Sequence, residues 1–219
     1  MTRPTTVGTV RINLSDYALE SVVWPKLRRV LQDYPDLKVE LFCDDGISDI
    51  IEEGYDAGIR LGERLDKDMI AVKIGQDWRL VVVGSPDYFT ANPTPSTPQD
   101  LGTHVCINTR QHSAGGLYAW EFEKEDKQVR VRVEGHLTIN HSGSMIDAAL
   151  LGYGLAYLPE SLVVGHIERG ELIQVLDDWC PLFEGYYLYY PNRRQNNLAL
   201  SLIVDALRFK LGQEPMRSE

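Results

Sequence analysis

Polar side chains that can hold a small ligand follow each of the first three predicted strands of this chain. A serine hydroxyl can donate a hydrogen bond to an acidic ligand, and an arginine guanidinium can bind a carboxylate through two parallel hydrogen bonds. In α/β sheets, ligands bind beyond the carboxyl ends of parallel strands, where helix N-termini present free N–H groups. The candidates in the first half of the chain are Ser15, Asp16, Asp44, Arg60 and Gly62.

The same residue types also have structural roles at such positions. Ser15 can cap the helix that follows it, and this role is compatible with ligand contact. Arg60 can bind a carboxylate ligand, or it can pair with Asp16, Asp44 or Asp45 and hold the first lobe together. The sequence leaves both alternatives open. If Arg60 contacts the ligand, the ligand is expected to be an anion.

A second group of candidates lies further along the chain. Asn108 and Thr109 end a predicted strand, and Asn140 and Ser142 lie at a predicted helix start. Their amides and hydroxyls can hydrogen-bond a ligand, but such residues are also common at strand ends and helix caps for local backbone reasons. Both interpretations stay open, and the neighbouring His141 is expected to be structural or exposed.

Motifs for catalysis, metals or nucleotides are not supported. The five histidines show no HxH or HExxH spacing. Ser142-Gly-Ser144 lacks the flanking glycines of a nucleophile elbow. Gly152-Tyr-Gly154 follows a helix and precedes a strand, the reverse of a dinucleotide-binding loop, and so predicts a helix end. We therefore expect no enzyme, no metal and no cofactor.

The elements that position the first group alternate between strand and helix. Alternating patterns predict strands at residues 10–14, 37–41 and 57–61. Between the first two, a predicted helix places Val23, Leu27, Val30, Leu31 and Tyr34 on one face. Pro25 predicts either a kink in this helix or its start, and a short helix from Ile47 is expected to stop at Gly54. This alternation is typical of a parallel sheet.

The rest of the chain predicts a second lobe that mixes parallel and antiparallel pairing. Ser85-Pro86 is expected to start a helix after a buried strand, and residues 92–98 form a loop. Strands are predicted at residues 78–83, 104–108, 118–123, 129–139 and 155–158, with a helix from about Ser142. A strand at 186–190 and a helix with Leu198, Leu202, Ala206 and Phe209 on one face are expected to return to the first sheet.

Composition is that of a globular protein. The 219 residues, 43% hydrophobic and 25% charged, suit one domain or two lobes. The net charge of -10 argues against a nucleic-acid footprint on this chain. No apolar run approaches the roughly 20 residues that cross a bilayer, and the start lacks a secretory pattern, so we expect a cytoplasmic protein without a membrane partner. Three cysteines without CxxC spacing are expected to be buried thiols.

Several stretches, in order along nearly the whole chain, resemble the effector-binding half of LysR-type transcriptional regulators. Gly8-Thr-Val-Arg-Ile-Asn-Leu resembles the first strand of that family, and Tyr55-Asp-Ala-Gly-Ile-Arg60-Leu-Gly62 resembles the third. Val83-Gly-Ser-Pro-Asp-Tyr-Phe89 is similar to the crossover into its second lobe. Ile139-Asn-His-Ser with Ala148-Ala-Leu-Leu-Gly-Tyr-Gly-Leu-Ala-Tyr-Leu-Pro159 is the most telling match. The motifs are weak individually and specific together.

The resemblance implies a type 2 periplasmic-binding-protein-like α/β fold, with two Rossmann-like lobes that each hold a mixed sheet and are joined by two crossover strands. Lobe I would comprise residues 7–82 plus 186–211 and lobe II residues 83–185, with flexible termini at 1–6 and 212–219.

The implied function is sensing of a small-molecule effector held between the lobes. The resemblance further implies a homodimer or tetramer, in which the helix at residues 21–34 of one subunit meets the second lobe of another. DNA would be reached only through an N-terminal winged helix-turn-helix domain, which this chain lacks. The alternative is a solute-binding protein of a transport system, which shares the fold; the absent signal pattern and the regulator motifs argue against it.

Overall fold

The chain consists of two compact units. The computed structural model describes residues 8–44, 50, 52–62, 69–110, 116–194 and 197–210. Unit 1 comprises Met1–Asp77 and Glu184–Glu219, and unit 2 comprises Trp78–Phe183. The chain therefore passes into unit 2 after Asp77 and returns after Phe183, where the sequence placed the two crossings after residues 82 and 185. The termini expected to be flexible lie outside the described residues.

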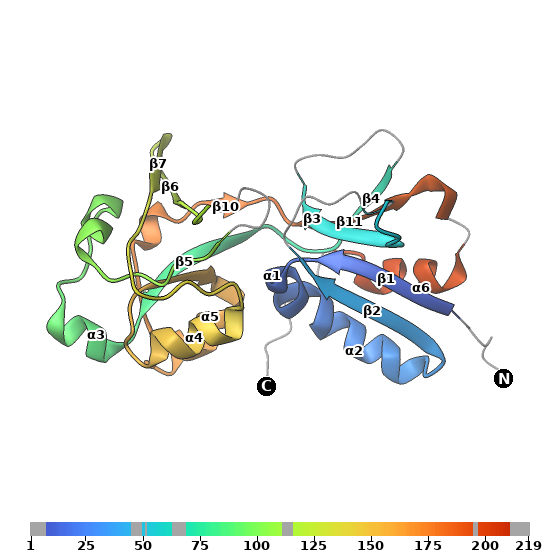
Figure 1. Cartoon of the computed structure of the whole chain (residues 1–219), viewed down its shortest axis with the longest axis horizontal. Helices are drawn as coiled ribbons and strands as arrows, with labels where there is room; N and C mark the ends of the chain where they lie inside the picture. The colour runs from blue at the N-terminus through green and yellow to red at the C-terminus, as the bar shows by residue number, and fades with distance from the viewer. Residues whose placement is uncertain are drawn as a thin grey trace. The chain divides into compact units, whose positions relative to one another are not determined.

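Unit 1 is built on a five-stranded mixed sheet in the order β2-β1-β3-β11-β4 (Figure 1). Its strands are β1 (Gly8–Leu14), β2 (Leu37–Cys43), β3 (Ala57–Leu61), β4 (Met69–Lys73) and β11 (Tyr186–Pro191). β1 pairs in parallel with β2 and β3, and β11 pairs antiparallel with β3 and β4. The three predicted strands of this lobe and the return of the 186–190 strand are confirmed, whereas β4 was not predicted.

Helices α2 (Trp24–Asp33) and α6 (Leu198–Leu207) pack against each other in unit 1, and α6 also contacts β1. Lys26 of α2 links the two helices to the sheet. Its Nζ donates to the carbonyl oxygen of Leu207 at the end of α6 (2.9 Å) and to that of Ile74 after β4. Cations at helix C-termini are stabilising. Burial lowers the pKa of the Lys26 ammonium.

The segment before α2 explains how the helix accommodates Pro25. A short α1 (Asp16–Ala18) leads into a π-helical turn at Leu19–Val23, and α2 then begins at Trp24 with Pro25 in its first turn. Proline lacks an N–H and its ring clashes with the carbonyl four residues earlier. The missing donor therefore falls where the hydrogen-bond pattern is already changing from π to α. Of the two alternatives for Pro25, the helix start is the one observed.

The predicted core face of α6 is wrong. Leu198 is 79% exposed, and Phe209 lies beyond the end of the helix. The buried face instead carries Ala199, Leu200, Ile203, Val204 and Leu207. Because α6 is apolar on several sides, helical periodicity alone could not select the side that meets β1 and α2.

Unit 2 has β5 (Trp78–Gly84) at its centre (Figure 1). β8 (Ala156–Pro159), β9 (Ile173–Val175) and β10 (Leu182–Phe183) all pair with β5 in antiparallel fashion. Isolated parallel bridges then join Cys106 to Leu155 and Asn108 to Thr138. The predicted mixture of parallel and antiparallel pairing in this lobe is confirmed.

Two of the strands predicted in unit 2 are not regular strands. Residues 104–108 form only isolated bridges, and the predicted 129–139 strand ends early, since β7 (Lys127–Val131) pairs with β6 (Trp120–Lys124) and stops. Gly135 shows how closely the chains then approach, because a Cβ there would lie 1.8 Å from the carbonyl oxygen of Cys106. The hairpin itself was predicted correctly.

The helices of unit 2 are α3 (Pro86–Ala91), α4 (Ser142–Leu150) and α5 (Glu160–Glu168). Ser85 caps α3 by accepting from the N–H of Tyr88, as Ser85-Pro86 predicted. Gly152 and Gly154 have φ values of +76° and +151°, which confirms a helix stop and explains the glycines. No described helix is long and apolar enough to span a membrane.

Candidate functional site

Arg60 links the carboxyl ends of three neighbouring segments of the unit 1 sheet. From β3, its Nη2 donates to the side-chain oxygen of Asn13 on β1 and lies 3.3 Å from the backbone oxygen of Asp44, which follows β2. Its Nη1 donates to the carbonyl of Ile59 at 2.9 Å. The contact with Asp44 is therefore a hydrogen bond to a neutral oxygen, and Asp45 lies outside the described residues. The guanidinium is held at the edge where ligands of such sheets bind.

Ser15 has the structural role that the sequence allowed. It is the N-cap of α1, and its Oγ accepts from the N–H of Ala18 at 3.1 Å. Asp16 is the first residue of α1, where a negative charge favours the helix N-terminus. Ser15 is half-buried, so its hydroxyl hydrogen can still be donated to another group.

Asp44 and Gly62 complete the group of sequence candidates in unit 1. The N–H of Asp44 donates to the carbonyl of Leu14 at 3.0 Å, which brings the end of β2 against the end of β1. A Cβ at Gly62 would lie 2.8 Å from the ring of Tyr187 and 2.9 Å from the carboxylate of Glu184. A side chain at Gly62 would therefore displace the ends of the Tyr187 and Glu184 side chains, and the described contacts show no ligand-binding feature at Gly62.

Asn13 was missed by the sequence analysis. It is fully buried on β1, in register with Phe42 of β2 and Gly58 of β3. Its Oδ1 accepts from Arg60, while its Nδ2 is buried without a hydrogen-bond partner. The only sequence signal for Asn13 is a polar residue between the apolar Ile12 and Leu14. In an alternating strand pattern such a residue is predicted to face solvent.

Asn108 and Thr109 lie at the end of their chain segment in unit 2. The backbone of Asn108 is paired on both sides, donating to Leu137 (2.9 Å) and accepting from Ile139 (2.8 Å). Its side chain is only 2% exposed, and Oδ1 has no hydrogen-bond partner. The Thr109 hydroxyl donates to the carbonyl of Ile139 at 3.1 Å and also contacts the Met145 sulfur. Thr109 therefore has a structural role, and Asn108 has an unused acceptor.

The start of α4 is capped by His141 and not by the two candidates beside it. Nδ1 of His141 accepts from the N–H of Ser144 at 3.2 Å, and the imidazole is exposed. Ser142 is the first residue of α4 and is buried, whereas Asn140 is exposed. The expectation that His141 is structural or exposed is confirmed, and the cap expected of Asn140 or Ser142 is wrong.

The thiols are not reactive where they are buried. Burial raises the pKa of Cys106 to about 12 and that of Cys180 to about 11. Both behave as core side chains, as expected. Cys43, at the end of the edge strand β2, is exposed, so the prediction of buried thiols is wrong there.

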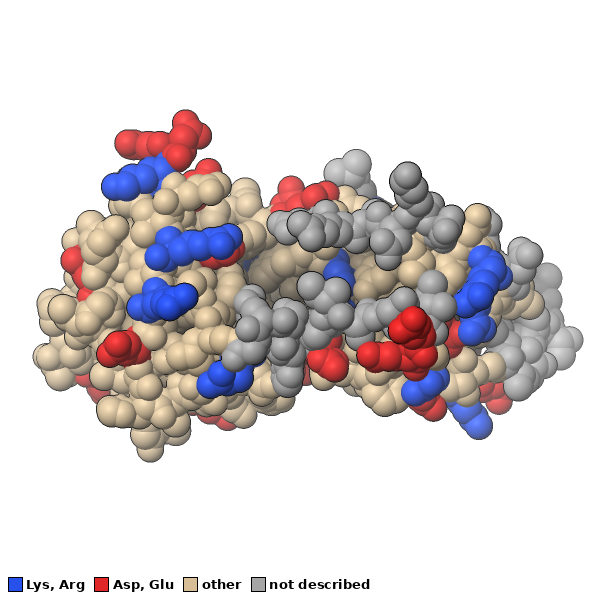
Figure 2. Space-filling model, turned by 45° about the horizontal axis from the view of Figure 1, so that its top comes forward, with Lys and Arg blue, Asp and Glu red and all other residues tan. Residues whose placement is uncertain are grey.

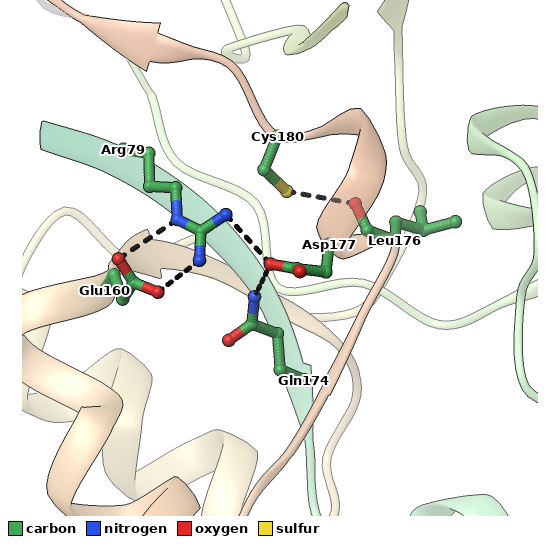
Figure 3. Close-up of polar contacts among 6 residues, drawn as sticks. All are labelled: Arg79, Glu160, Gln174, Leu176, Asp177 and Cys180. Atoms are coloured by element: carbon green, nitrogen blue, oxygen red, sulfur yellow. Dashed lines mark hydrogen bonds and ion pairs between the residues drawn. The ribbon is translucent and has the colours of Figure 1, made fainter. Parts of the chain in front are cut away.

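A polar cluster surrounds Arg79, the second residue of β5 (Figure 3). The guanidinium of Arg79, on β5, forms a bidentate pair with Glu160, the first residue of α5, and its Nη1 lies 2.8 Å from Asp177. Gln174 donates to the same Asp177 carboxylate. Every charge in this cluster has a partner, so the cluster joins β5, α5 and the turn after β9, and serves packing.

The charged side chains of the described residues bear on nucleic-acid and metal binding. On the face shown in Figure 2, Lys and Arg side chains are scattered among acidic and uncharged ones, without a continuous basic surface over the described part. Within the described ranges, no group of three His, Cys, Asp or Glu side chains is placed to hold a metal ion. The described side chains at the strand ends of unit 1 offer hydrogen-bond donors, hydrogen-bond acceptors and the positive charge of Arg60.

Comparison with known proteins relates the chain to transcriptional regulators. It matches the family model described as LysR substrate binding domain over residues 4–211. A putative transcriptional regulator of Pseudomonas aeruginosa is 54% identical over 202 residues, which cover 92% of this chain and 66% of that protein. The HTH-type transcriptional regulator PgrR of Escherichia coli is 41% identical over 203 residues, covering 93% and 68%. The chain thus spans about two thirds of the length of these relatives.

Solved structures show the same fold. The regulatory domain of AphB from Vibrio vulnificus aligns with a TM-score of 0.78 at 23% identity, covering 91% of this chain and 98% of that one. Full-length AphB of Vibrio cholerae, a virulence activator, aligns with a TM-score of 0.80 at 22% identity, over 93% of this chain and 69% of that one. The predicted type 2 periplasmic-binding-protein-like fold is confirmed, and the transport alternative is not favoured. The chain belongs to the LysR substrate binding domain family, the effector-sensing part of LysR-type transcriptional regulators.

Proposed function

We propose that this domain senses a small carboxylate and thereby controls DNA binding or transcription by a longer regulator. In unit 1 the proposed contacts come from Ser15, Asp16, Asp44 and Arg60. Asn108, Asn140 and Ser142 are the remaining candidates in unit 2. The role requires binding alone, so no bond of the effector is broken. The regulator acts in the cytoplasm, and DNA is contacted by an N-terminal helix-turn-helix domain.

The observation that carries this proposal is the position of Arg60. Its guanidinium reaches from β3 to Asn13 on β1 and to the residue after β2, so it is fixed at the carboxyl ends of three adjacent strands. Arginine binds carboxylates through a planar fork of N–H donors, which suits recognition of a small acid. A preorganised guanidinium also loses little conformational freedom when the ligand arrives.

Sensing follows from linkage. An effector shifts the domain between conformations only by as much as it binds one of them more tightly. In the regulator this shift is read out by subunits that pair as a homodimer or tetramer, with residues 21–34 expected at the contact. Light scattering after size-exclusion chromatography tests the assembly, and a monomer at high concentration would contradict it.

Ligand-induced thermal stabilisation tests the binding role. At 100 times its dissociation constant a ligand adds about 2.7 kcal/mol, which raises the melting temperature by about 5 to 11 °C in a chain of this size. The panel consists of small aliphatic and aromatic acids with their neutral amides, and the variant is Arg60→Gln. We expect acids to stabilise the wild type, amides to do so less, and Arg60→Gln to lose the difference.

Arg11→Gln is the matched control, because it removes the same charge from the same sheet. Arg11, on β1, pairs with Glu40 of β2 at 3.0 Å, and its guanidinium lies over the ring of Phe42, also on β2. The described interactions include no contact between Arg11 and Arg60. Its variant should lower the melting temperature slightly and keep the response to acids. An equal loss of response in both variants would refute a specific role for Arg60.

A further inference from the structure

A groove of about 460 Å³ runs between α2 and α6 and lies entirely within unit 1. The two helices are antiparallel, since Lys26 in the first turn of α2 donates to the carbonyl of Leu207 at the end of α6. The groove is apolar along its length and has one acidic residue on each helix. Its walls include Val30, Asp33 and Tyr34 of α2 and Leu198, Leu202 and Asp205 of α6.

The outer side of α6 supplies much of the apolar surface of this α2–α6 groove. The inner side of the helix is buried and contacts β1 and α2. On the outer side, Leu198 is 79% exposed, and Leu202 is half-buried opposite Val30 of α2. A helix that is apolar on all sides is usually covered on all sides. One exposed leucine is ordinary, but apolar side chains grouped in a groove with a charged rim are typical of a contact site for a protein.

Both signs of charge border the groove. Asp33 and Asp205 are exposed at its rim, and Asp205 lies 4.0 Å from the guanidinium of Arg208. Arg29 lies four residues before Asp33 and therefore on the same side of α2, one turn away. It is exposed, and it forms no ion pair with any residue that the structure describes. The rim thus presents a cation beside two acids.

A second copy of this chain has the chemistry that the groove requires. An occupant needs apolar side chains for the groove and a cation for Asp33 and Asp205. The groove surface presents both, in Leu198 with Leu202 and in Arg29, and a two-fold contact needs the same self-complementary surface on both partners. The net charge of -10 makes the cation necessary, because two copies repel each other unless opposite charges meet locally.

We infer that the α2–α6 groove is a self-association surface, in which unit 1 of one copy packs against unit 1 of a second copy. Leu198 and Leu202 enter the groove of the partner, and Arg29 meets the acidic residues there, twice across the two-fold axis. The inference rests on the proposed assembly of the regulator and specifies one of its contacts. It brings α6 into that contact, whereas the resemblance implies a contact of residues 21–34 with the second lobe.

The first test places a charge in the apolar part of the surface. Leu198 is the first residue of α6, where a glutamate is favourable for the helix, so Leu198→Glu should fold normally. A carboxylate buried against the partner without a cation is costly. Light scattering over a range of concentrations should therefore show the loss of one association step, with its dissociation constant raised at least about tenfold. Leu151→Glu is the matched control, because Leu151 is 74% exposed in unit 2, and this variant should associate like the wild type.

The second test reverses the two sets of charges separately. One variant is Arg29→Glu, which leaves only acids at the rim, and the other is Asp33→Arg with Asp205→Arg, which leaves only cations. Each variant alone should lose the association step, because like charges meet across the contact. An equimolar mixture should regain it, because each copy then meets the opposite charge on its partner. Circular dichroism checks that both variants are folded.

The outcomes separate this inference from the proposed assembly. A wild type that associates, with Leu198→Glu and both charge variants associating equally well, would overturn the inference and leave the assembly intact. This is also the result expected if the groove serves an unrelated protein. A mixture that fails to regain the step lost by both folded charge variants would overturn the inference as well. A wild type that stays monomeric at high concentration would contradict the assembly itself.

Discussion

Removing the Arg79 side chain should destabilise unit 2 measurably, because three elements meet there. The Arg79 side chain is 25% exposed, and its guanidinium contacts both carboxylate oxygens of Glu160 and one of Asp177 (Figure 3). These contacts hold the pKa of Arg79 above its ordinary value, with the hydrogen bonds to Glu160 as the main cause. Arg79→Met keeps the length and apolar stem of the side chain and deletes only the charged head.

The burial of this cluster sets the expected size of the effect. Exposed ion pairs contribute about 0.2 to 1 kcal/mol, while breaking a fully buried pair costs about 3 to 5 kcal/mol. Arg79 lies between these limits, so we expect a loss of about 2 kcal/mol. For a chain of this length, that corresponds to a fall in melting temperature of about 4 to 8 °C.

Tryptophan fluorescence during heating is the suitable assay, because three of the four tryptophans, Trp78, Trp120 and Trp179, belong to unit 2. The control is Arg130→Met in the same unit. Arg130 pairs with Glu121 at 2.9 Å, but its side chain is 76% exposed, so its loss should cost no more than about 0.5 kcal/mol. Equal shifts for the two variants would refute the argument that burial and bidentate geometry make the Arg79 cluster strong.

Three further predictions concern the pH response, close packing and thiol reactivity. Burial lowers the pKa of His104 below the value of about 6.5 that histidine has in the unfolded chain. The neutral imidazole therefore contributes its full stabilisation above about pH 6.5, and this contribution is lost as the pH falls below that value. His104→Gln should reduce the pH dependence of the melting temperature between about pH 7.5 and 5.5. Gly135→Ala should lower the melting temperature by at least about 5 °C, because its Cβ would meet a carbonyl oxygen at 1.8 Å, whereas Gly102→Ala, with no atom within 4 Å, should have almost no effect. A thiol reagent should label one cysteine in the native protein and three in denaturant, and Cys43→Ser should remove the native signal.

Most of the fold follows from local patterns, and the exceptions have physical reasons. Alternation located β1, β2 and β3, and a continuous apolar run located β5. The Ser85-Pro86 and Gly152-Tyr-Gly154 signals located one helix start and one helix end. β4 was missed because its partner β11 comes from the far end of the chain, so nothing local marks it as a strand. The 129–139 strand was predicted too long because its pairing with β6 stops after Val131. Beyond that point the chain passes close to Cys106 at Gly135, and the sequence pattern does not show this contact.

The candidate site shows the same limit. The sequence located Arg60 and Asn108 at strand ends from pattern alone, and the structure adds what surrounds them. Asn13 could not be found in this way, because a residue that alternates with apolar neighbours reads as solvent-facing unless the sheet is known to be covered on both sides. The N-cap role of His141 depends on the backbone angles at the start of α4, and a sequence pattern does not fix these angles.

The order of strands in unit 1 has a consequence for synthesis on the ribosome. β11 lies between β3 and β4, where Leu188 pairs with both Ile59 and Val72. Until that strand emerges, β3 and β4 have no partner on their facing edges, and the sheet of the nascent chain remains divided. Unit 2 is contiguous in sequence and can fold first. Contacts between such distant residues slow folding and leave strand edges exposed until they form, so the facing edges of β3 and β4 stay open to wrong pairing until β11 is synthesised.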